Sequence, residues 1–224
     1  MTTTLSATGL ALRAARGAVF GPLDADIDTP MAVITGARGS GKTCLLLTAA
    51  GRMTPSAGTV RVLGEHRPAA IRRFSALAGF DGIDELEQSV TVGNALTERA
   101  RWNAPWYRYV RAFGDTEVRR ALAPAFGERP LPSARTMIWD LDEDEALLLR
   151  IALALLDEPR LLVLDDVDHV HDPRARAAVV DRLGALAASG ITVLLSAAGF
   201  EADLYAALPV EVQHLALTTE EQYA

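Results

Sequence analysis

The chain has 224 residues, half of them hydrophobic, and a formal net charge of −7 at pH 7. It is long enough to bury a full core, it holds no apolar run near the roughly 18 residues of a membrane-spanning helix, and its acidity disfavours nucleic acid as the main partner. The segment before Ala15 lacks the pattern of a secretory signal, and the single cysteine, Cys44, excludes an internal disulfide and fits a reducing cytoplasm.

The first predicted elements are strands. Residues 10–27 alternate irregularly and contain Gly17, Gly21 and Pro22, which predicts short antiparallel strands joined by a turn. The apolar run at 31–34 is typical of a short buried strand.

A glycine-rich loop follows this strand and precedes a predicted helix at residues 44–50. Its sequence, Gly36 to Thr43, fits the phosphate-binding pattern G-x-x-x-x-G-K-[ST] at every fixed position. Such a loop directs backbone N–H groups toward a polyphosphate, Lys42 would reach the β and γ phosphates, and Thr43 would ligate magnesium. The alternative is a glycine-rich turn that binds nothing, but Lys42 is the only lysine among 22 basic residues and occupies the one position that requires an ammonium. The predicted nucleotide-binding residues are Gly36, Ala37, Arg38, Gly39, Ser40, Gly41, Lys42, Thr43 and Cys44.

Loops and short strands continue the chain. Residues 51–58 predict a loop, residues 59–64 alternate as a half-buried strand, and residues 76–80 form another apolar run. An acidic turn at 81–85 follows this run.

A helical pattern covers residues 92–122, where Pro105 interrupts it and Gly114 begins it again. One interpretation makes its aromatic residues the core of a small helical subdomain, and the other leaves part of them exposed as a docking surface. The cluster comprises Arg99, Arg101, Trp102, Trp106, Tyr107, Arg108, Tyr109, Arg111 and Phe113, and a loop marked by Pro124, Pro130 and Pro132 follows.

An acidic helix start is predicted at residue 141. The helix runs to residue 156, and Asp142 with Glu145 forms a capping box. Strands that alternate with helices predict an α/β fold with a mostly parallel sheet. The remaining predicted elements are a helix at 174–188, a buried strand at 191–196, a helix after Glu201 and a last strand around 210–217.

The apolar strand at 161–164 ends in acidic residues. This is the Walker B pattern, in which the carboxylate of Asp165 reaches the magnesium ion that Thr43 shares. His169 and His171 follow closely, but no third ligand completes a metal site with them.

Together these motifs resemble the ATP-binding subunit of an ABC transporter, over nearly the whole chain. Besides the phosphate-binding loop, the likeness rests on residues 50–60, on residues 90–96 and on the spacing from Leu141 to Asp166. The resemblance implies a P-loop NTPase core with a mostly parallel sheet, an N-terminal antiparallel β subdomain and a small helical subdomain. It implies one ABC-type ATPase domain at 1–224, with the nucleotide-binding core at 1–91 and 136–224 and the helical subdomain at 92–135.

Several positions depart from the family's pattern. Residues 141–145 replace the signature loop with an acidic sequence, Asp81 stands at the glutamine of the Q-loop, and Ala197 stands at the switch histidine. Asp166 takes the place of the catalytic glutamate, and Asp172 matches the D-loop aspartate. The implied catalytic residue is Asp166, and the implied metal ligands are Thr43, Asp165 and Asp81.

The resemblance implies that the chain binds ATP and Mg²⁺ and works with a membrane permease at the inner face of the cell membrane. The departures predict hydrolysis that is weak or dependent on a partner subunit. Four carboxylates in the signature loop would repel a phosphate bound by an opposite subunit, which favours a heterodimer over a symmetric homodimer. The alternative is a regulatory ATP-binding module outside any transporter. A P-loop kinase or GTPase is disfavoured by the long spacing to residues 161–164.

Overall fold

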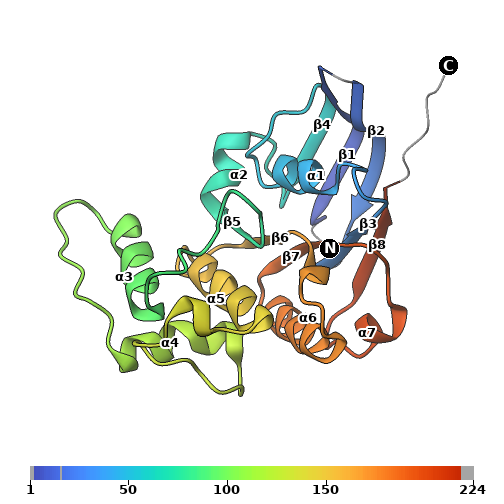
Figure 1. Cartoon of the computed structure of the whole chain (residues 1–224). Coiled ribbons are helices and arrows are strands. Elements are labelled where there is room, and N and C mark those ends of the chain that lie inside the picture. Colours follow the sequence, from blue (N-terminus) through green and yellow to red (C-terminus); the bar gives the residue numbers. More distant parts are fainter. Residues whose placement is uncertain (1–2, 16, 218–224) are drawn as a thin grey trace.

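The computed structural model describes residues 3–15 and 17–217, which form two sheets and the helices packed on them (Figure 1). Five strands in the order β5-β6-β7-β3-β8 form a parallel sheet, and three in the order β2-β1-β4 form an antiparallel sheet. The strands are β1 (Leu5–Ala14), β2 (Gly17–Ile27), β3 (Met31–Thr35), β4 (Ala57–Val62), β5 (Ser75–Ala78), β6 (Leu161–Leu164), β7 (Thr192–Ala197) and β8 (Val212–Ala216). The helices are α1 (Lys42–Ala49), α2 (Pro68–Phe74), α3 (Val92–Asn103), α4 (Asp115–Phe126), α5 (Glu143–Leu155), α6 (Pro173–Ala188) and α7 (Ala202–Ala206), with 3₁₀ turns η1 (Ile138–Asp140) and η2 (Val167–His169).

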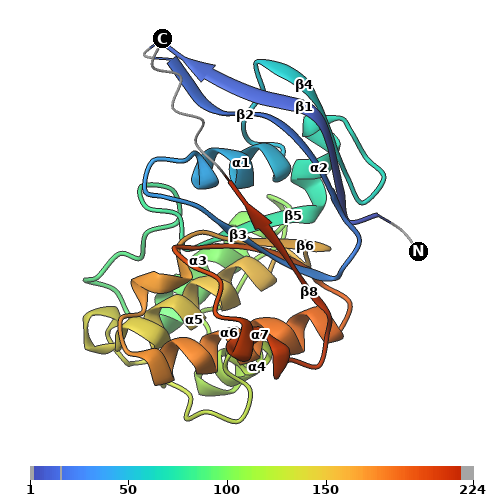
Figure 2. The ribbon, with the colours of Figure 1, turned by 90° about the vertical axis from the view of Figure 1, so that its right-hand side faces the viewer.

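The parallel sheet divides the core into two parts because successive side chains of a strand point to opposite faces. On β3, Met31 and Val33 pack into the core that α5 and α6 cover, whereas Ala32 and Ile34 pack into the core on the other face, with α1 and the antiparallel sheet. Both faces of the parallel sheet are covered, so every residue of β3, β6 and β7 is buried. Figure 2 shows α1 and α2 between the two sheets and α4 to α7 beyond the parallel sheet. The predicted fold class is confirmed.

The antiparallel sheet begins earlier than the sequence predicts, since β1 starts at Leu5.

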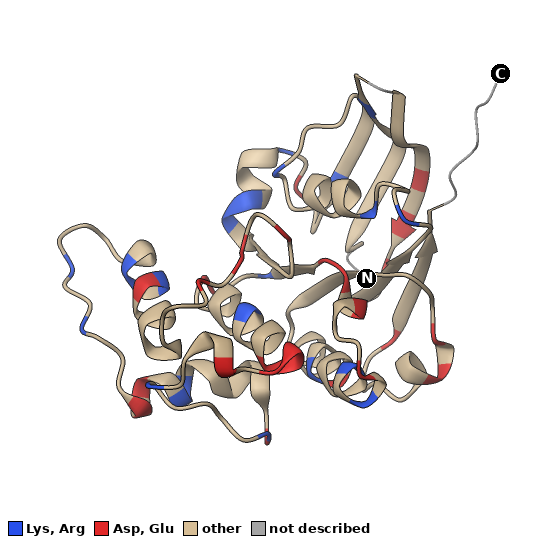
Figure 3. Cartoon of the chain, in the orientation of Figure 1, with Lys and Arg blue, Asp and Glu red and all other residues tan. Residues whose placement is uncertain are grey.

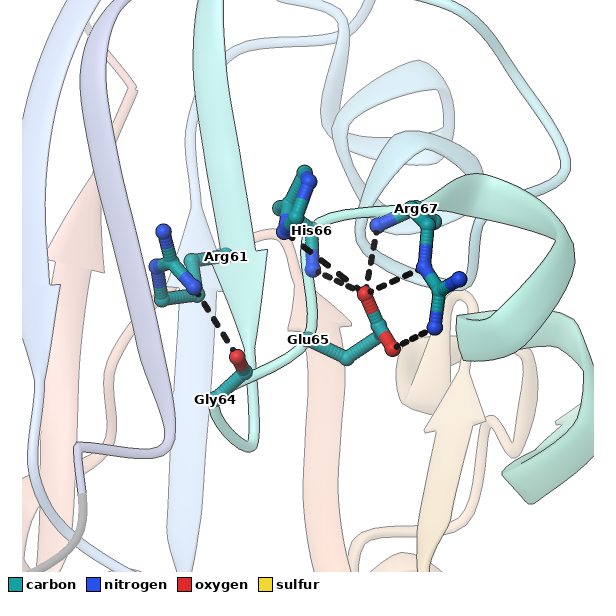
Figure 4. A network of polar contacts seen from close by, with 5 residues as sticks. All are labelled: Arg61, Gly64, Glu65, His66 and Arg67. Atoms are coloured by element: carbon teal, nitrogen blue, oxygen red, sulfur yellow. Dashed lines mark hydrogen bonds and ion pairs between the residues drawn. The ribbon is translucent and has the colours of Figure 1, made fainter.

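A polar turn links this sheet to α2. The carboxylate of Glu65 accepts hydrogen bonds from the backbone and side chain of Arg67, and the Nη1 of Arg61 donates to the carbonyl of Gly64 at 3.0 Å (Figure 4). The Arg67 side chain and the neighbouring N–H groups lower the pKa of Glu65 to about 2. Helix α2 itself was not predicted, although Pro68 is a favourable first residue for it.

The helical segment differs from the sequence prediction in two ways. Residues 104–114 form no helix in the structure, and Pro124 lies inside α4, where a loop was predicted. The core of this segment is aliphatic with one Phe, as Val118, Leu122 and Phe126 of α4 are buried. The interpretation that the aromatic cluster forms the core is therefore wrong for its four largest exposed members, Trp102, Trp106, Tyr107 and Tyr109.

The C-terminal elements follow the predicted order. Helix α5 begins at Glu143, two residues after the predicted start, because Asp142 is its N-cap and Glu145 its third residue in a capping box. Helix α7 and strand β8 correspond to the predicted last elements, and residues 218–224 of the predicted tail lie outside the described part. None of the helices in the described residues is long and apolar enough to cross a membrane.

Candidate functional site

The loop between β3 and α1 is built from glycines that the backbone requires. Gly39 and Gly41 have φ angles of 83° and 89°, and a Cβ on Gly41 would lie 2.7 Å from the carbonyl oxygen of Val19. A Cβ on Gly36 would meet the Ser40 hydroxyl at 2.6 Å. That hydroxyl is buried and has no hydrogen-bond partner among the described residues. The loop thus combines closely packed glycines with a buried, unused hydroxyl donor, which fits a bound phosphate.

Lys42 begins α1 and reaches back over the loop. Its Nζ donates to the carbonyl oxygens of Gly36 at 2.8 Å and Ala37 at 3.3 Å. The first turn of α1 contains no acidic residue, so no carboxylate of that turn offsets the positive end of the helix dipole. The ammonium, the helix N-terminus and the loop therefore concentrate positive potential at one point.

The sheet brings Thr43 and Asp165 together from distant parts of the sequence. The Thr43 Oγ1 donates to the Asp165 Oδ2 at 2.6 Å, across 122 positions of the chain. The other carboxylate oxygen of Asp165 accepts from the hydroxyl of Ser196, at the end of β7. Two oxygen atoms that meet beside the phosphate-binding loop are a donor set of the type that Mg²⁺ prefers. Cys44, next to Thr43, is partly buried, and this burial and Asp165 raise the pKa of its thiol.

Ser196 was not predicted as a site residue. Its Oγ accepts the backbone N–H of Asp166 at 2.8 Å while its proton goes to Asp165, so one hydroxyl holds both acidic residues. The signal that could have revealed it is a polar residue at the carboxyl end of an apolar strand, where parallel sheets place their sites.

Asp166 lies beyond the end of β6 in a left-handed conformation, with φ 51° and ψ 69°. Burial, the carboxylate of Asp168 and the carboxylate of Asp165 raise the pKa of Asp166 above its ordinary value. Ala197, the residue at the switch position, ends β7 and is buried, so it offers no polar side chain to the site.

Asp81 lines a cavity of about 410 Å³ together with Asp165 and Asp166. This places Asp81 near the predicted metal ligands, but no described hydrogen bond joins it to Thr43 or Asp165, so its role as a ligand stays a prediction. Glu143 and Arg150 of α5 line the same cavity.

The turn that carries Asp81 is fixed by an ion pair that the sequence did not predict. The carboxylate of Asp84 accepts from the backbone N–H of Gly79 at 3.0 Å and of Phe80 at 2.7 Å. It also accepts from Arg150 of α5, from Nε at 3.0 Å and from Nη2 at 2.7 Å. The pair joins the turn after β5 to the middle of α5 and is largely shielded from solvent.

Three carboxylates at the start of α5 are bound by groups of the chain itself. Asp142 caps the helix and Glu145 accepts the backbone N–H of Asp142 at 3.2 Å. Asp144 is buried and forms an ion pair with Arg129. The helix N-terminus is therefore capped by its own side chains, and its dipole is offset by its own charges.

The fourth carboxylate, on Glu143, contacts the loop after β6. It accepts from the backbone N–H of His171 at 3.0 Å and lies 3.1 Å from that residue's Nδ1. These contacts lower the pKa of Glu143.

The His169 and His171 rings lie 6.1 Å apart between centroids, and the described residues contain no group of three metal-binding side chains. Asp172 caps α6 by accepting from Ala175 at 2.8 Å.

Comparison with known proteins gives consistent relatives. No protein-family model matches the chain. It is 31% identical over 164 residues to the Nod factor export ATP-binding protein I of Rhizobium johnstonii, which covers 73% of this chain and 50% of that protein. It is 31% identical over 192 residues to the protein of the same name from Paraburkholderia xenovorans, which covers 84% and 56%. The chain belongs to the ABC family of ATP-binding proteins.

Solved ABC cassettes share the fold. The ADP conformation of an ATP-binding cassette of an ABC transporter superposes with a TM-score of 0.74 at 14% identity, covering 98% of this chain and 91% of that one. The cbiO1 protein of Clostridium perfringens, described as part of the ABC transporter complex cbiONQ, gives 0.72 at 15% identity, with 98% and 88% covered. The present ABC chain spans about half the length of the curated relatives it matches.

Proposed function

We propose that this ABC chain is the ATP-binding subunit of a transporter complex, and that it holds Mg-ATP at the loop between β3 and α1. The observation that carries the proposal is the convergence of Lys42, Thr43 and Asp165 at the carboxyl end of the parallel sheet. The glycine-rich loop and the helix N-terminus suit a triphosphate, and the Thr–Asp oxygen pair suits its cation. A kinase or GTPase is not favoured, since the relatives are ABC proteins.

Each residue of the loop would have a defined task with ATP bound. Backbone N–H groups from Gly36 to Thr43 would hold the phosphates, and Lys42 would exchange its contacts with Gly36 and Ala37 for phosphate oxygens. Thr43 and Asp165 would hold the magnesium ion, and Ser196 would keep Asp165 oriented. When bound, the cation neutralises developing charge on the phosphates.

The hydrolytic machinery is incomplete. Asp166 has one methylene fewer than a glutamate, and its backbone amide is fixed by Ser196, so its carboxylate has a short reach. Catalysis is sensitive to misplacement of about 1 Å. The methyl side chain of Ala197 cannot form a hydrogen bond to a phosphate or a water molecule. We therefore propose that hydrolysis by this chain alone is weak.

The acidic start of α5 bears on which subunit this chain can pair with. In a symmetric homodimer this acidic turn would face the opposite phosphate, and like charges would oppose closure. The capping contacts also occupy the backbone N–H groups of Asp142 and Glu145, so these two donors are not available to that phosphate. We propose a second ATP-binding subunit with an intact signature loop as partner, together with a membrane permease that holds the complex at the inner face of the membrane. A regulatory module without a permease is the alternative, and a gene for a multi-span permease beside this one would argue against it.

The purified protein is expected to bind ATP and to turn it over at least about 100-fold more slowly than an ordinary enzyme rate of about 10 per second. The measurement is phosphate release under saturating Mg-ATP, corrected with a Lys42→Ala preparation for contaminating ATPases. The double variant Asp166→Glu with Ala197→His is expected to be faster, because a positioned acid–base pair contributes roughly 100-fold or more. An ordinary rate for the unmodified chain would contradict the proposal.

Ser196→Ala is expected to weaken Mg²⁺ binding roughly 10- to 100-fold, because loss of a group that orients a metal ligand has this effect. The measurement is the magnesium dependence of ATP affinity by calorimetry. Ser189→Ala is the matched control, since its hydroxyl only donates to the carbonyl of Leu186 at the end of α6. An unchanged magnesium dependence for Ser196→Ala would show that Asp165 does not need this contact.

A further inference from the structure

The end of α3 and the loop that joins it to α4 have a composition unlike the rest of the chain. Residues 99–114, named here the aromatic–arginine segment, contain four arginines and no acidic residue, in a protein with a net charge of −7. Figure 3 shows its loop with basic positions and no acidic ones up to the start of α4. Figure 1 shows that the loop lies on the side of α3 that faces away from both sheets.

The large side chains of this segment are exposed to solvent. The exposed fractions are 79% for Trp102, 96% for Trp106, 75% for Tyr107 and 83% for Tyr109. Only two other large hydrophobic side chains in the described residues are comparably exposed, Ile83 and Trp139. Exposure of this much aromatic area in one place costs solvation free energy unless another surface covers it.

The loop is a fixed projection and not a loose chain. The backbone N–H of Phe113 donates to the Thr97 hydroxyl at 2.8 Å, which ties its end to α3. In a turn, the Arg108 N–H donates to the Pro105 carbonyl at 2.8 Å, and Trp106 and Tyr107 are the two central residues of this turn, named here the tip. The rings of these two residues pack edge to face, with centroids 5.9 Å apart.

The four arginines of the segment differ in their partners. Arg99 is paired with Asp157, near the end of α5, and Arg101 donates to the carbonyl of Val110. Arg108 and Arg111 form no ion pair with a described residue. Carboxylates also lie close to the segment. Glu98 and Asp115 adjoin it in sequence, and Glu98 lines a cavity with Trp102. Glu117 and Glu158 line a cavity of about 750 Å³ together with Arg108 and Arg111.

The geometry points to an anionic lipid surface as the occupant of this loop. Trp and Tyr rings are enriched where hydrocarbon meets headgroups because one end of each ring is apolar and the other polar. Each arginine beside them strengthens binding to anionic headgroups by about 1 kcal/mol, which is roughly five-fold in affinity. A projecting tip inserts into a soft interface, whereas the acidic remainder of the protein is repelled from it. This inference does not depend on nucleotide binding, because ATP affinity can be measured separately on the same purified protein.

Co-sedimentation of the full chain with vesicles tests the proposal. Binding is expected with phosphatidylcholine and phosphatidylglycerol in equal parts, and little with phosphatidylcholine alone. Arg108→Gln with Arg111→Gln is expected to lower the partition coefficient about 30-fold. Arg13→Gln with Arg73→Gln removes the same charge from exposed positions of β1 and α2, and is expected to change it less than about 3-fold. An equal loss in both pairs would indicate general charge attraction and overturn the proposal.

A second readout tests insertion of the tip. The chain has three tryptophans, so Trp102→Phe with Trp139→Phe leaves Trp106 as the only one. Its emission is expected to shift to the blue on anionic vesicles and to be quenched by brominated lipid chains. Unchanged emission when the protein is fully bound would overturn insertion. Absence of binding to anionic vesicles would overturn the lipid assignment and leave a protein partner as the occupant of the loop.

Discussion

Lys42→Ala is expected to lower the affinity for Mg-ATP roughly 100-fold or more, because loss of one member of a desolvated charge pair costs about 2–5 kcal/mol. Lys42 is the only ammonium side chain in the protein, and its Nζ is already held over the loop by the carbonyls of Gly36 and Ala37. No other cation of α1's first turn can replace it. Isothermal calorimetry with Mg-ATP measures the loss directly.

Two further variants sharpen this test. Lys42→Arg keeps the charge but replaces a compact ammonium by a planar fork, so we expect affinity well below that of the unmodified protein. Arg73→Ala removes a positive charge from an exposed position of α2 and is expected to leave the affinity unchanged. ATP binding that survives Lys42→Ala would contradict the assignment of the loop as a nucleotide site.

Asp84→Ala is expected to lower the free energy of unfolding by about 3–5 kcal/mol. The substitution leaves the guanidinium of Arg150, only 13% exposed, without its partner. It also leaves the backbone N–H groups of Gly79 and Phe80 without their acceptor. Urea denaturation followed by circular dichroism measures the change as a lower midpoint at constant slope.

The control for this prediction lies on the same turn. Asp81→Ala removes a carboxylate that makes no hydrogen bond to a described residue, and is expected to change stability by less than about 0.5 kcal/mol. Asp84→Ala combined with Arg150→Met removes both charges and is expected to recover part of the loss. If Asp84→Ala were no more destabilising than Asp81→Ala, the ion pair would not hold the turn after β5.

The aromatic–arginine segment shows where sequence reasoning reached its limit. The composition identified the aromatic cluster. Whether the cluster forms a core or a docking surface depended on how much aliphatic area the helices already bury. In the structure Val118, Leu122 and Phe126 fill that core, so the tryptophans are not needed inside. Pro124 likewise lies within α4, because the packing of its helix outweighs the local preference for a break.

The sequence by itself determined the P-loop and the strand-to-carboxylate pattern at Asp165, because each needs specific residues at fixed local spacing. It also determined the capping of α5 by Asp142 and Glu145, which is contained in one turn. The same two motifs predicted that Asp165 and Thr43 meet at one cation. Only the tertiary structure decided that Ser196 joins them, since the parallel sheet brings β6 and β7 beside each other. The contact of Ser196 with Asp165 depends on strand order and register, and no local pattern in a single sequence encodes these.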